Sequence, residues 1–336
     1  MGINECAFGR TADEVYCDIY QKLEKFGQVA FGRNGQTKEL THVCMSIADP
    51  TQRWVERRKP AVSPAFAIAE LVMIMNGSDE AMLLNAWNPA LPKYQGKYDR
   101  YPGAYGKRLR YSFGFDQINR AYDALKNNPE SRQVVMEIWK PDIDLPQSKG
   151  RPNNDDIPCN ICSLLKIRDG KLLWTQIMRS NDIVFGLPYN FLQFTFLQEI
   201  IAGWLNVGVG EYMHISDSLH MYVNNKCCID LGKNVHLNTE HLKLEKKESE
   251  NIFGELLIRM KELSRNECTS GYIKSIVRSK YLPEAYQNML ILLCEYIAYR
   301  HNMDDEVIHC CEQNISNTLY RDLMKEWMNK EERNRQ

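Results

Sequence analysis

The sequence predicts a protein of mixed α and β structure in which helices pack against a sheet, and three observations indicate this. Residues 161–167 and 171–177 have the apolar pattern of strands and are joined by an Asp169-Gly170 turn, which indicates an antiparallel pair on a larger sheet. Residues 188–205 are apolar nearly all round, as expected of a central buried helix on which the sheet packs. After about residue 249 the apolar residues recur at helical spacing, without strand signals.

The remaining elements follow from length, spacing and turn residues. Residues 11–27 and 63–76 have the length and apolar spacing of helices, and residues 133–139 have the pattern of a strand. Residues 141–157 are polar and rich in Pro, Gly and Asn, which predicts a long loop that leads to Cys159. Long loops of this kind are often functional.

The length and the change in pattern predict two parts of unequal size. A chain of 336 residues is long enough for one large domain with a small appendage. We therefore expect a main domain at residues 1–249 and a helical C-terminal extension at residues 250–336.

The net charge and the number of cysteines limit the possible classes of protein. A net charge of -1 gives no long-range attraction to nucleic acid or to an anionic membrane, so any phosphate must be held locally. Eleven cysteines, an odd number without a framework pattern, indicate a reducing compartment. The N-terminus has no apolar signal core, and the longest apolar run contains Glu295. These features predict a cytoplasmic protein with no membrane or nucleic-acid partner, and no residue spacing indicates a metal site.

Several spaced motifs resemble the thymidylate synthase family. They are a Pro-Cys-Asn segment at 158–160, Arg-Ser-Asn-Asp at 179–182, Gly-Leu-Pro-Tyr-Asn at 186–190 and His-Met-Tyr at 220–222. The resemblance covers roughly residues 20 to 230. It implies an α+β fold, in which helices cover one face of a large twisted mixed sheet and the other face packs against the sheet of a second subunit.

The resemblance gives Cys159 the role of nucleophile. A cysteine thiolate can add to C6 of a pyrimidine, and C5 then attacks an electrophilic methylene group, here that of 5,10-methylenetetrahydrofolate. Nearby arginines favour the thiolate. A buried core cysteine is the ordinary alternative, but the preceding loop and the following arginine motif favour the nucleophile. A redox pair with Cys162 is disfavoured, because positions i and i+3 of a strand face opposite sides.

Three further catalytic residues are implied. Glu70 lies on an apolar helical face, where a carboxylate is costly, and the family uses this glutamate in proton transfer through ordered water. A structural salt bridge is the rival interpretation. Tyr105 matches the tyrosine that helps to remove the C5 proton, and Asn160 replaces the usual histidine beside the nucleophile.

Arginines are implied to hold the 5′-phosphate. Arg33, Arg179 and Ser180 match ligands of this group, and guanidinium forks suit a phosphate dianion. Arg132 is implied to reach the site from the partner subunit of a homodimer. The family usually has two adjacent arginines there, whereas this chain has Arg132-Gln133.

The remaining ligands are also implied by the resemblance. Asn190 occupies the position that reads the base, and its amide suits O4 and N3–H of uracil. His220 and Tyr222 match groups that bind the sugar 3′-hydroxyl. Asp182 matches the carboxylate that binds the pterin ring of the folate, and Trp87 is expected to lie against that ring.

Departures from the family pattern bear on the product. Asn181 gives the Arg-Ser-Asn-Asp form of the hydroxymethylase branch, and the apolar C-terminal tail that closes thymidylate synthases is not visible. Without closure, water rather than hydride is expected to capture the exocyclic methylene, which predicts 5-hydroxymethylation. Uridylate is the favoured substrate and cytidylate the next. The alternatives are a thymidylate synthase that makes dTMP from dUMP, and a non-catalytic nucleotide- or RNA-binding protein. His214 is expected to be a structural histidine.

Overall fold

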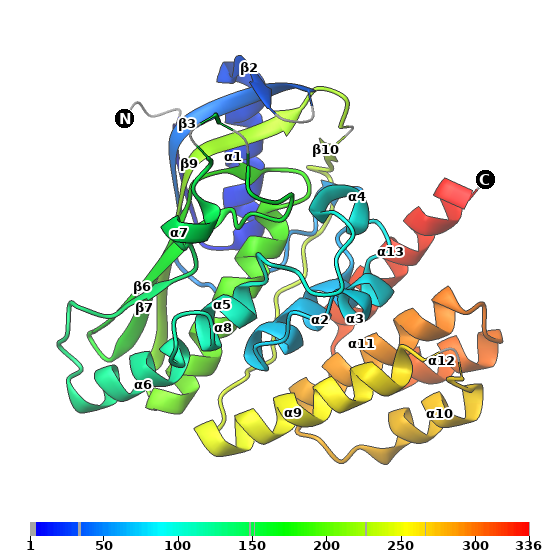
Figure 1. The fold of residues 1–336 in the computed structure, drawn as a ribbon. Coiled ribbons are helices and arrows are strands. Elements are labelled where there is room, and N and C mark those ends of the chain that lie inside the picture. The colour runs from blue at the N-terminus through cyan, green and yellow to red at the C-terminus, as the bar shows by residue number, and fades with distance from the viewer. Residues whose placement is uncertain are drawn as a thin grey trace.

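The computed structural model describes residues 5–32, 35–147, 149–150, 152–225, 227–265 and 267–335. In Figure 1 a twisted sheet stands on one side of the molecule, and helices cover one of its faces. The described strands are β1 (Cys6–Gly9), β2 (Gln28–Gly32), β3 (Gly35–Ile47), β4 (Arg58–Lys59), β5 (Val135–Glu137), β6 (Asn160–Arg168), β7 (Lys171–Met178), β8 (Asn181–Asp182), β9 (Gly208–Tyr222) and β10 (Cys228–Ile229).

Within the described residues the main sheet has eight strands. Its central path is β1-β3-β9-β7-β6-β5, while β2 pairs with β3 and β8 pairs with β9. The β3–β9 and β6–β7 pairs are antiparallel, whereas β7–β9 and β8–β9 are parallel. The sheet is therefore mixed, and the expected α+β class is confirmed.

The helices are α1 (Ala12–Phe26), α2 (Pro64–Met75), α3 (Ala81–Trp87), α4 (Pro92–Gln95), α5 (Tyr105–Arg110), α6 (Gln117–Asn127), α7 (Pro141–Asp144), α8 (Leu187–Leu205), α9 (Lys246–Leu263), α10 (Ser270–Ser279), α11 (Glu284–Arg300), α12 (Asp305–Asn314) and α13 (Thr318–Arg335). The helices predicted at 11–27 and 63–76 correspond to α1 and α2. The predicted strand pair corresponds to β6 and β7, whose turn residues Asp169 and Gly170 both have positive φ.

The long loop before Cys159 contains one short helix that its composition did not indicate. Asp144, at the end of α7, accepts hydrogen bonds from both Nη atoms of Arg108 at 2.8 and 2.9 Å. It also accepts from the backbone N–H of Lys140 at 2.8 Å. These bonds hold the turn closed and fix the loop to α5 beside the cavity described below.

Helix α8 is the centre of the molecule. It packs against β7, β9 and α2, and nearly all of its side chains are buried, with Pro188 in its first turn. Helices α9, α11 and α13 pack against the other side of α2. In Figure 1 the yellow α9 and the orange α11 form the lower right of the molecule, and the red α13 rises from them toward the C-terminus. The division of the chain at residue 249 stays a prediction.

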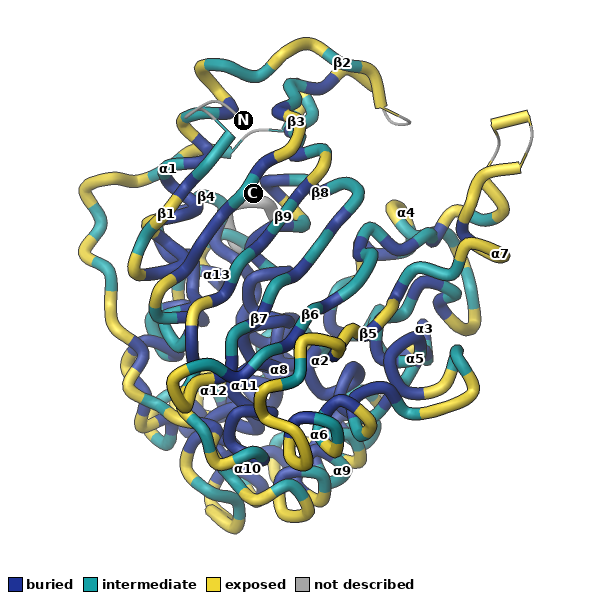
Figure 2. The backbone as a smooth tube through the Cα atoms, turned by 90° about the vertical axis from the view of Figure 1, so that its left-hand side faces the viewer, coloured by how far each residue is buried: buried dark blue, intermediate teal, exposed yellow. Residues whose placement is uncertain are grey.

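The other face of the sheet carries no helix of the described chain. Figure 2 shows this face, with buried and half-buried residues alternating along the strands. The half-buried Cys44, Met213 and Ile215 alternate with the fully buried Val43, Tyr212 and His214, so they belong to the outer face. Within the described residues, no helix combines the length and apolar character needed to cross a membrane.

Candidate active site

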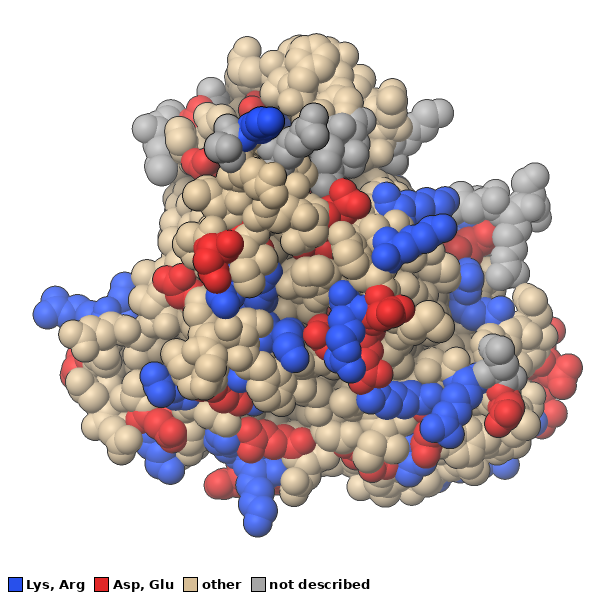
Figure 3. Space-filling model, in the orientation of Figure 1, with Lys and Arg blue, Asp and Glu red and all other residues tan. Residues whose placement is uncertain are grey.

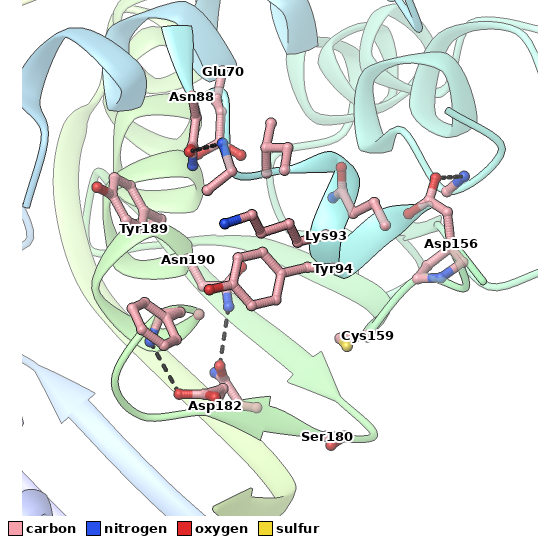
Figure 4. Close-up of a pocket in the computed structure, with 18 of the residues that line it drawn as sticks. Glu70, Asn88, Lys93, Tyr94, Asp156, Cys159, Ser180, Asp182, Tyr189 and Asn190 are labelled. Atoms are coloured by element: carbon pink, nitrogen blue, oxygen red, sulfur yellow. Dashed lines mark hydrogen bonds between the residues drawn. The ribbon is translucent and has the colours of Figure 1, made fainter. Parts of the chain in front are cut away.

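One large cavity, of about 1360 Å³, lies between the sheet and the helices. Figure 4 shows residues from separate elements around it, with Glu70 on α2, Cys159 at the start of β6, and Ser180 and Asp182 after β7. Twelve residues of the prediction can be placed, and ten of them line it: Glu70, Trp87, Tyr105, Cys159, Arg179, Ser180, Asp182, Asn190, His220 and Tyr222. The cavity is therefore the candidate active site.

Cys159 stands beside a guanidinium group. Nη2 of Arg179 lies 3.9 Å from the Cys159 sulfur, and Arg179 also donates to the carbonyls of Pro158 at 3.0 Å and Ile157 at 3.3 Å. The Arg179 guanidinium lies over the ring of Trp139, 5.3 Å from its centroid. This network fixes the positive charge next to the thiol, where it stabilises a thiolate.

Glu70 brings a protonated carboxyl group to the cavity. Burial raises the pKa of Glu70 to about 8, although a hydrogen bond with Gln193 of α8 works in the opposite direction. Its buried Oε2 has no hydrogen-bond partner, and no Lys, Arg or His pairs with it within the described part of the chain. The salt bridge considered as the rival interpretation is not present among these residues. Glu70 is thus mainly a neutral acid at pH 7.

Tyr105 and Asn160 lie next to Cys159, but only Tyr105 lines the cavity. Burial, and then the nearby Cys159, raise the pKa of Tyr105 far above its usual value, while a hydrogen bond with Asn160 lowers it. Asn160 is fully buried, and its Oδ1 accepts from Nε2 of Gln176 at 2.7 Å. Asn160 is therefore a buried neighbour of Tyr105, held by Gln176, and does not line the cavity.

The expected sugar and phosphate ligands meet where β8 pairs with β9. This pairing places Asp182 opposite His220 and brings Oγ of Ser180 to 3.4 Å from Nδ1 of His220. The His220 and Tyr222 rings meet edge to face, with centroids 5.4 Å apart. Sequence reasoning missed Arg58, a buried arginine that also lines this part of the cavity. In the sequence Arg58 stands among other charged residues, a pattern that is typical of an exposed segment.

Of the two remaining predicted arginines, only Arg132 belongs to the described residues. Arg33 lies outside the described residues. Arg132 is exposed in the segment before β5 and does not line the cavity. Figure 3 shows basic and acidic side chains intermingled on the face that it presents, without a field of one sign. This face therefore offers no long-range attraction for an anion.

Asp182 has a structural contact in addition to its place on the cavity. Its Oδ1 accepts from the backbone N–H of Val184 at 2.7 Å and of Phe185 at 3.0 Å. These bonds hold the turn that leads into α8. Burial raises the pKa of Asp182, while these N–H groups and the nearby His220 lower it.

Asp156 was not predicted, although it lines the cavity close to Cys159 in the sequence. It accepts a hydrogen bond from the N–H of Gly103 at 2.7 Å, and burial raises its pKa to about 6. A Cβ at Gly103 would lie 2.9 Å from Asp156 oxygens, so the close approach requires glycine. The only signal in the sequence was an acidic pair within a long polar loop.

The C-terminal helices form one wall of the cavity, which sequence reasoning also missed. The ring of Trp87 lies 5.4 Å from that of Tyr296 on α11, which lies 5.0 Å from that of Trp327 on α13. Arg300, Lys330 and Glu331 line the same wall. Near α8, the half-exposed rings of Tyr94 and Phe185 meet with centroids 5.9 Å apart.

The arrangement suits addition of a nucleophile to a planar, polar ring. It has a thiol beside a cation, a neutral buried acid, a tyrosine hydroxyl and the amide of Asn190, all on one cavity. The volume is large enough for a nucleotide and a second aromatic molecule together.

Comparisons with known proteins identify relatives. The family model described as "Thymidylate synthase" matches residues 15–269. The chain is 31% identical over 248 residues to the deoxyuridylate hydroxymethyltransferase of Bacillus phage SP01, covering 69% of this chain and 63% of that protein. It is also 31% identical over 218 residues to the deoxyuridylate hydroxymethyltransferase of Pseudomonas phage M6. This match covers 62% of this chain and 60% of that protein. A thymidylate synthase of Listeria monocytogenes matches over 137 residues at 31% identity. This match covers 39% of this chain and 41% of that protein. The chain thus spans less than two thirds of the length of these relatives.

Proposed function

The chain belongs to the thymidylate synthase family, and on this premise we propose that it transfers a one-carbon unit to C5 of a pyrimidine nucleoside 5′-monophosphate. The observation that carries the proposal is the Cys159 thiol beside Arg179 on a cavity that also holds the neutral acid Glu70. A binding protein would need neither a stabilised thiolate nor a buried acid.

Cys159, Glu70 and Tyr105 have separate roles in the proposed reaction. Cys159 adds to C6 of the base, and the electron pair of the C5–C6 bond moves onto C5 and O4. Glu70, protonated at neutral pH, can supply a proton toward O4 through ordered water. Tyr105, placed beside Cys159 and Asn160, takes part in removal of the C5 proton before the Cys159–C6 bond breaks.

Folate fits the wall formed by the C-terminal helices. When bound, 5,10-methylenetetrahydrofolate supplies a one-carbon unit at the oxidation level of formaldehyde. Trp87, Tyr296 and Trp327 provide aromatic surface, and Nε1 of Trp87 is buried without a hydrogen-bond partner among the described residues. Arg300 and Lys330 provide positive charge for the carboxylates of such a ligand. Asp182 is the carboxylate offered to the pterin ring.

The favoured product is the 5-hydroxymethyl nucleotide. Two relatives carry the name deoxyuridylate hydroxymethyltransferase, and Asn181 gives the Arg-Ser-Asn-Asp form noted above. The favoured substrate is dUMP, because the Asn190 amide can donate to O4 and accept from N3–H.

The test offers dUMP, UMP, dCMP and CMP separately, with methylenetetrahydrofolate, and identifies the nucleotide products by mass spectrometry. We expect 5-hydroxymethyl-dUMP and tetrahydrofolate. The second candidate is thymidylate synthesis, which the name of the Listeria relative supports. A 5-methyl product with release of dihydrofolate, seen as a rise in absorbance, would establish it in place of hydroxymethylation.

We also propose a homodimer formed through the outer face of the sheet. This face carries half-buried apolar side chains such as Met213 and Ile215 and has no covering helix in the described chain. Arg132 is exposed and absent from the cavity of its own chain, so it is available to a partner. In the dimer Arg132 would hold the phosphate in the partner's site.

A further inference from the structure

An unbroken line of hydrogen bonds runs from the core to the wall of the cavity. The hydroxyl of Tyr212 lies 2.9 Å from Nδ1 of His214, and Nε2 of His214 lies 3.0 Å from Nδ2 of Asn181. Oδ1 of Asn181 lies 3.1 Å from Nδ2 of Asn190, the link drawn beside Asn190 in Figure 4. Tyr212, His214 and Asn181 are all at least 99% buried.

The surroundings of Asn181 determine which atoms donate and which accept in this line of hydrogen bonds. Its Nδ2 is 3.2 Å from the Met178 sulfur and 3.5 Å from Oγ of Ser216, in addition to Nε2 of His214. A thioether sulfur only accepts, so this end of the amide must be the donor. Nε2 of His214 is therefore the acceptor.

The charge and the tautomer of the His214 ring follow from these contacts. Burial lowers the pKa of His214 to about 3, so the ring is neutral at pH 7 and carries one proton. Since Nε2 accepts from Asn181, the proton is on Nδ1 and is donated to the hydroxyl oxygen of Tyr212. The tautomer is thus fixed by the partners on both sides.

The opposite end of Asn181 fixes Asn190. Oδ1 of Asn181 accepts from Nδ2 of Asn190, and a Cβ at Gly186 would lie only 2.7 Å from this oxygen. One side-chain N–H of Asn190 is thereby bonded to Asn181. Its Oδ1 and its second N–H remain for a ligand in the cavity, and the two cannot exchange places unless the whole line reverses.

We propose that Tyr212, His214 and Asn181 are positioning residues that hold the Asn190 amide in the orientation that reads a 4-oxo pyrimidine with N3–H. This rests on the proposed function, in which Asn190 contacts the base. Reversing every bond of the line would exchange the donor and acceptor of Asn190 and suit a 4-amino pyrimidine with an unprotonated N3. Base selectivity therefore depends on a histidine that does not touch the substrate.

The experiment measures dissociation constants of dUMP and dCMP by calorimetry for the intact chain and three variants. Tyr212→Phe leaves the Nδ1 proton without an acceptor, and His214→Leu removes the acceptor for Asn181. We expect each to lower the dUMP-over-dCMP preference by about tenfold or more. His214→Gln can still accept from Asn181, so it should keep the preference within about threefold.

A second measurement, ¹⁵N NMR of labelled histidine, does not depend on nucleotide binding. We expect a protonated Nδ1 and an unprotonated Nε2 for His214, with the signal assigned by its loss in His214→Gln. In Tyr212→Phe both nitrogens should move toward intermediate shifts. A merely structural histidine would alter stability in these variants without moving the preference or the tautomer.

The outcomes separate the two proposals. If the intact chain binds neither nucleotide, the proposed function fails, and the base selectivity assigned to the line fails with it, even where the tautomer is as expected. If nucleotides bind but the preference is unchanged in both Tyr212→Phe and His214→Leu, only the positioning role is overturned. A proton on Nε2 of His214 in the intact chain also overturns it.

Discussion

At neutral pH Glu70 presents a carboxylic acid to the cavity, because it is buried and no cationic side chain of the described residues pairs with it. Burial raises its pKa to about 8, and the Gln193 amide only partly offsets this. The folded chain therefore keeps a proton that the unfolded chain releases at much lower pH. It follows that Glu70 costs stability between its ordinary pKa and about pH 8, and that the cost grows as pH rises through this window.

Glu70→Gln should therefore stabilise the fold at high pH while impairing catalysis. We expect the free energy of unfolding in urea to rise by about 1–3 kcal/mol at pH 8 and to change little near pH 4. The rate of product formation should fall by about a hundredfold or more, because the amide cannot donate an acidic proton.

The matched control is Glu248→Gln, an exposed carboxylate on α9. It should change neither the pH dependence of stability nor the rate. Equal stabilisation by Glu70→Gln at both pH values would contradict a raised pKa at this residue.

The guanidinium of Arg179 should govern the reactivity of Cys159. Without the charge 3.9 Å from its sulfur, less of the thiol is ionised at neutral pH. We expect Arg179→Gln to slow alkylation of Cys159 by iodoacetamide by about tenfold, measured by mass spectrometry of its peptide. Arg168→Gln, at the far end of β6, should leave the rate unchanged. An unchanged rate in Arg179→Gln would show that the thiolate is not stabilised by this arginine.

At the scale of elements, helices α11 and α13 belong to the cavity as much as the sheet does. Tyr296 and Trp327 extend the aromatic surface begun by Trp87, and Arg300 lies 3.9 Å from Glu331 at the same wall. The C-terminal helices therefore form part of the cavity lining in addition to packing on α2.

Arg300→Ala tests this role. Arg300 is only half-buried, so we expect its loss to change stability by less than about 0.5–1 kcal/mol. The KM for methylenetetrahydrofolate should rise about five- to tenfold while the KM for the nucleotide stays constant, since the lost charge faces the folate. Arg278→Ala, on the exposed side of α10, is the control and should affect neither constant. A matching rise in both KM values would argue against a folate-specific wall.

At the scale of the whole molecule, the outer face of the sheet is the surface through which we propose that two chains pair. Met213, Ile215 and Cys44 lie on a broad, twisted surface that no described helix covers, whereas the inner face is packed on α8. Pairing of two such faces would bury this surface and bring each exposed Arg132 to the partner's cavity.

Mixing two inactive variants tests the shared site. Cys159→Ser lacks the nucleophile and Arg132→Ala lacks the proposed phosphate ligand, so each homodimer should be inactive or nearly so. Random reassembly after denaturation should give mixed dimers in which one site has both defects and the other has neither. We expect recovery of about a quarter of the wild-type activity from the statistics of mixing.

The control is each variant refolded alone, which should remain inactive. A mixture no more active than its two components, or an active Arg132→Ala homodimer, would contradict the contribution of Arg132 across the interface.

Local signals predicted part of this fold well. The Asp169-Gly170 turn between alternating segments predicted β6 and β7, and the apolar run after Pro188 predicted α8, because both patterns arise from burial of nearby residues. The long strands β3 and β9 were not predicted. They pair over residues about 175 positions apart, and the polar residues His214 and Ser216 of β9 are fully buried, which breaks the expected alternation.

The sequence by itself determined the family, since spaced motifs such as Arg179-Ser180-Asn181-Asp182 require only residue order, and it predicted a nucleophile and most of the residues that line the cavity. Only the tertiary structure decided the surroundings of those residues. The neutral state of Glu70, the wall from α11 and α13, the buried position of Asn160 and the line from Tyr212 to Asn190 all arise from contacts between distant segments. Burial and hydrogen bonding set protonation and amide orientation, and both depend on neighbours in space rather than in the chain.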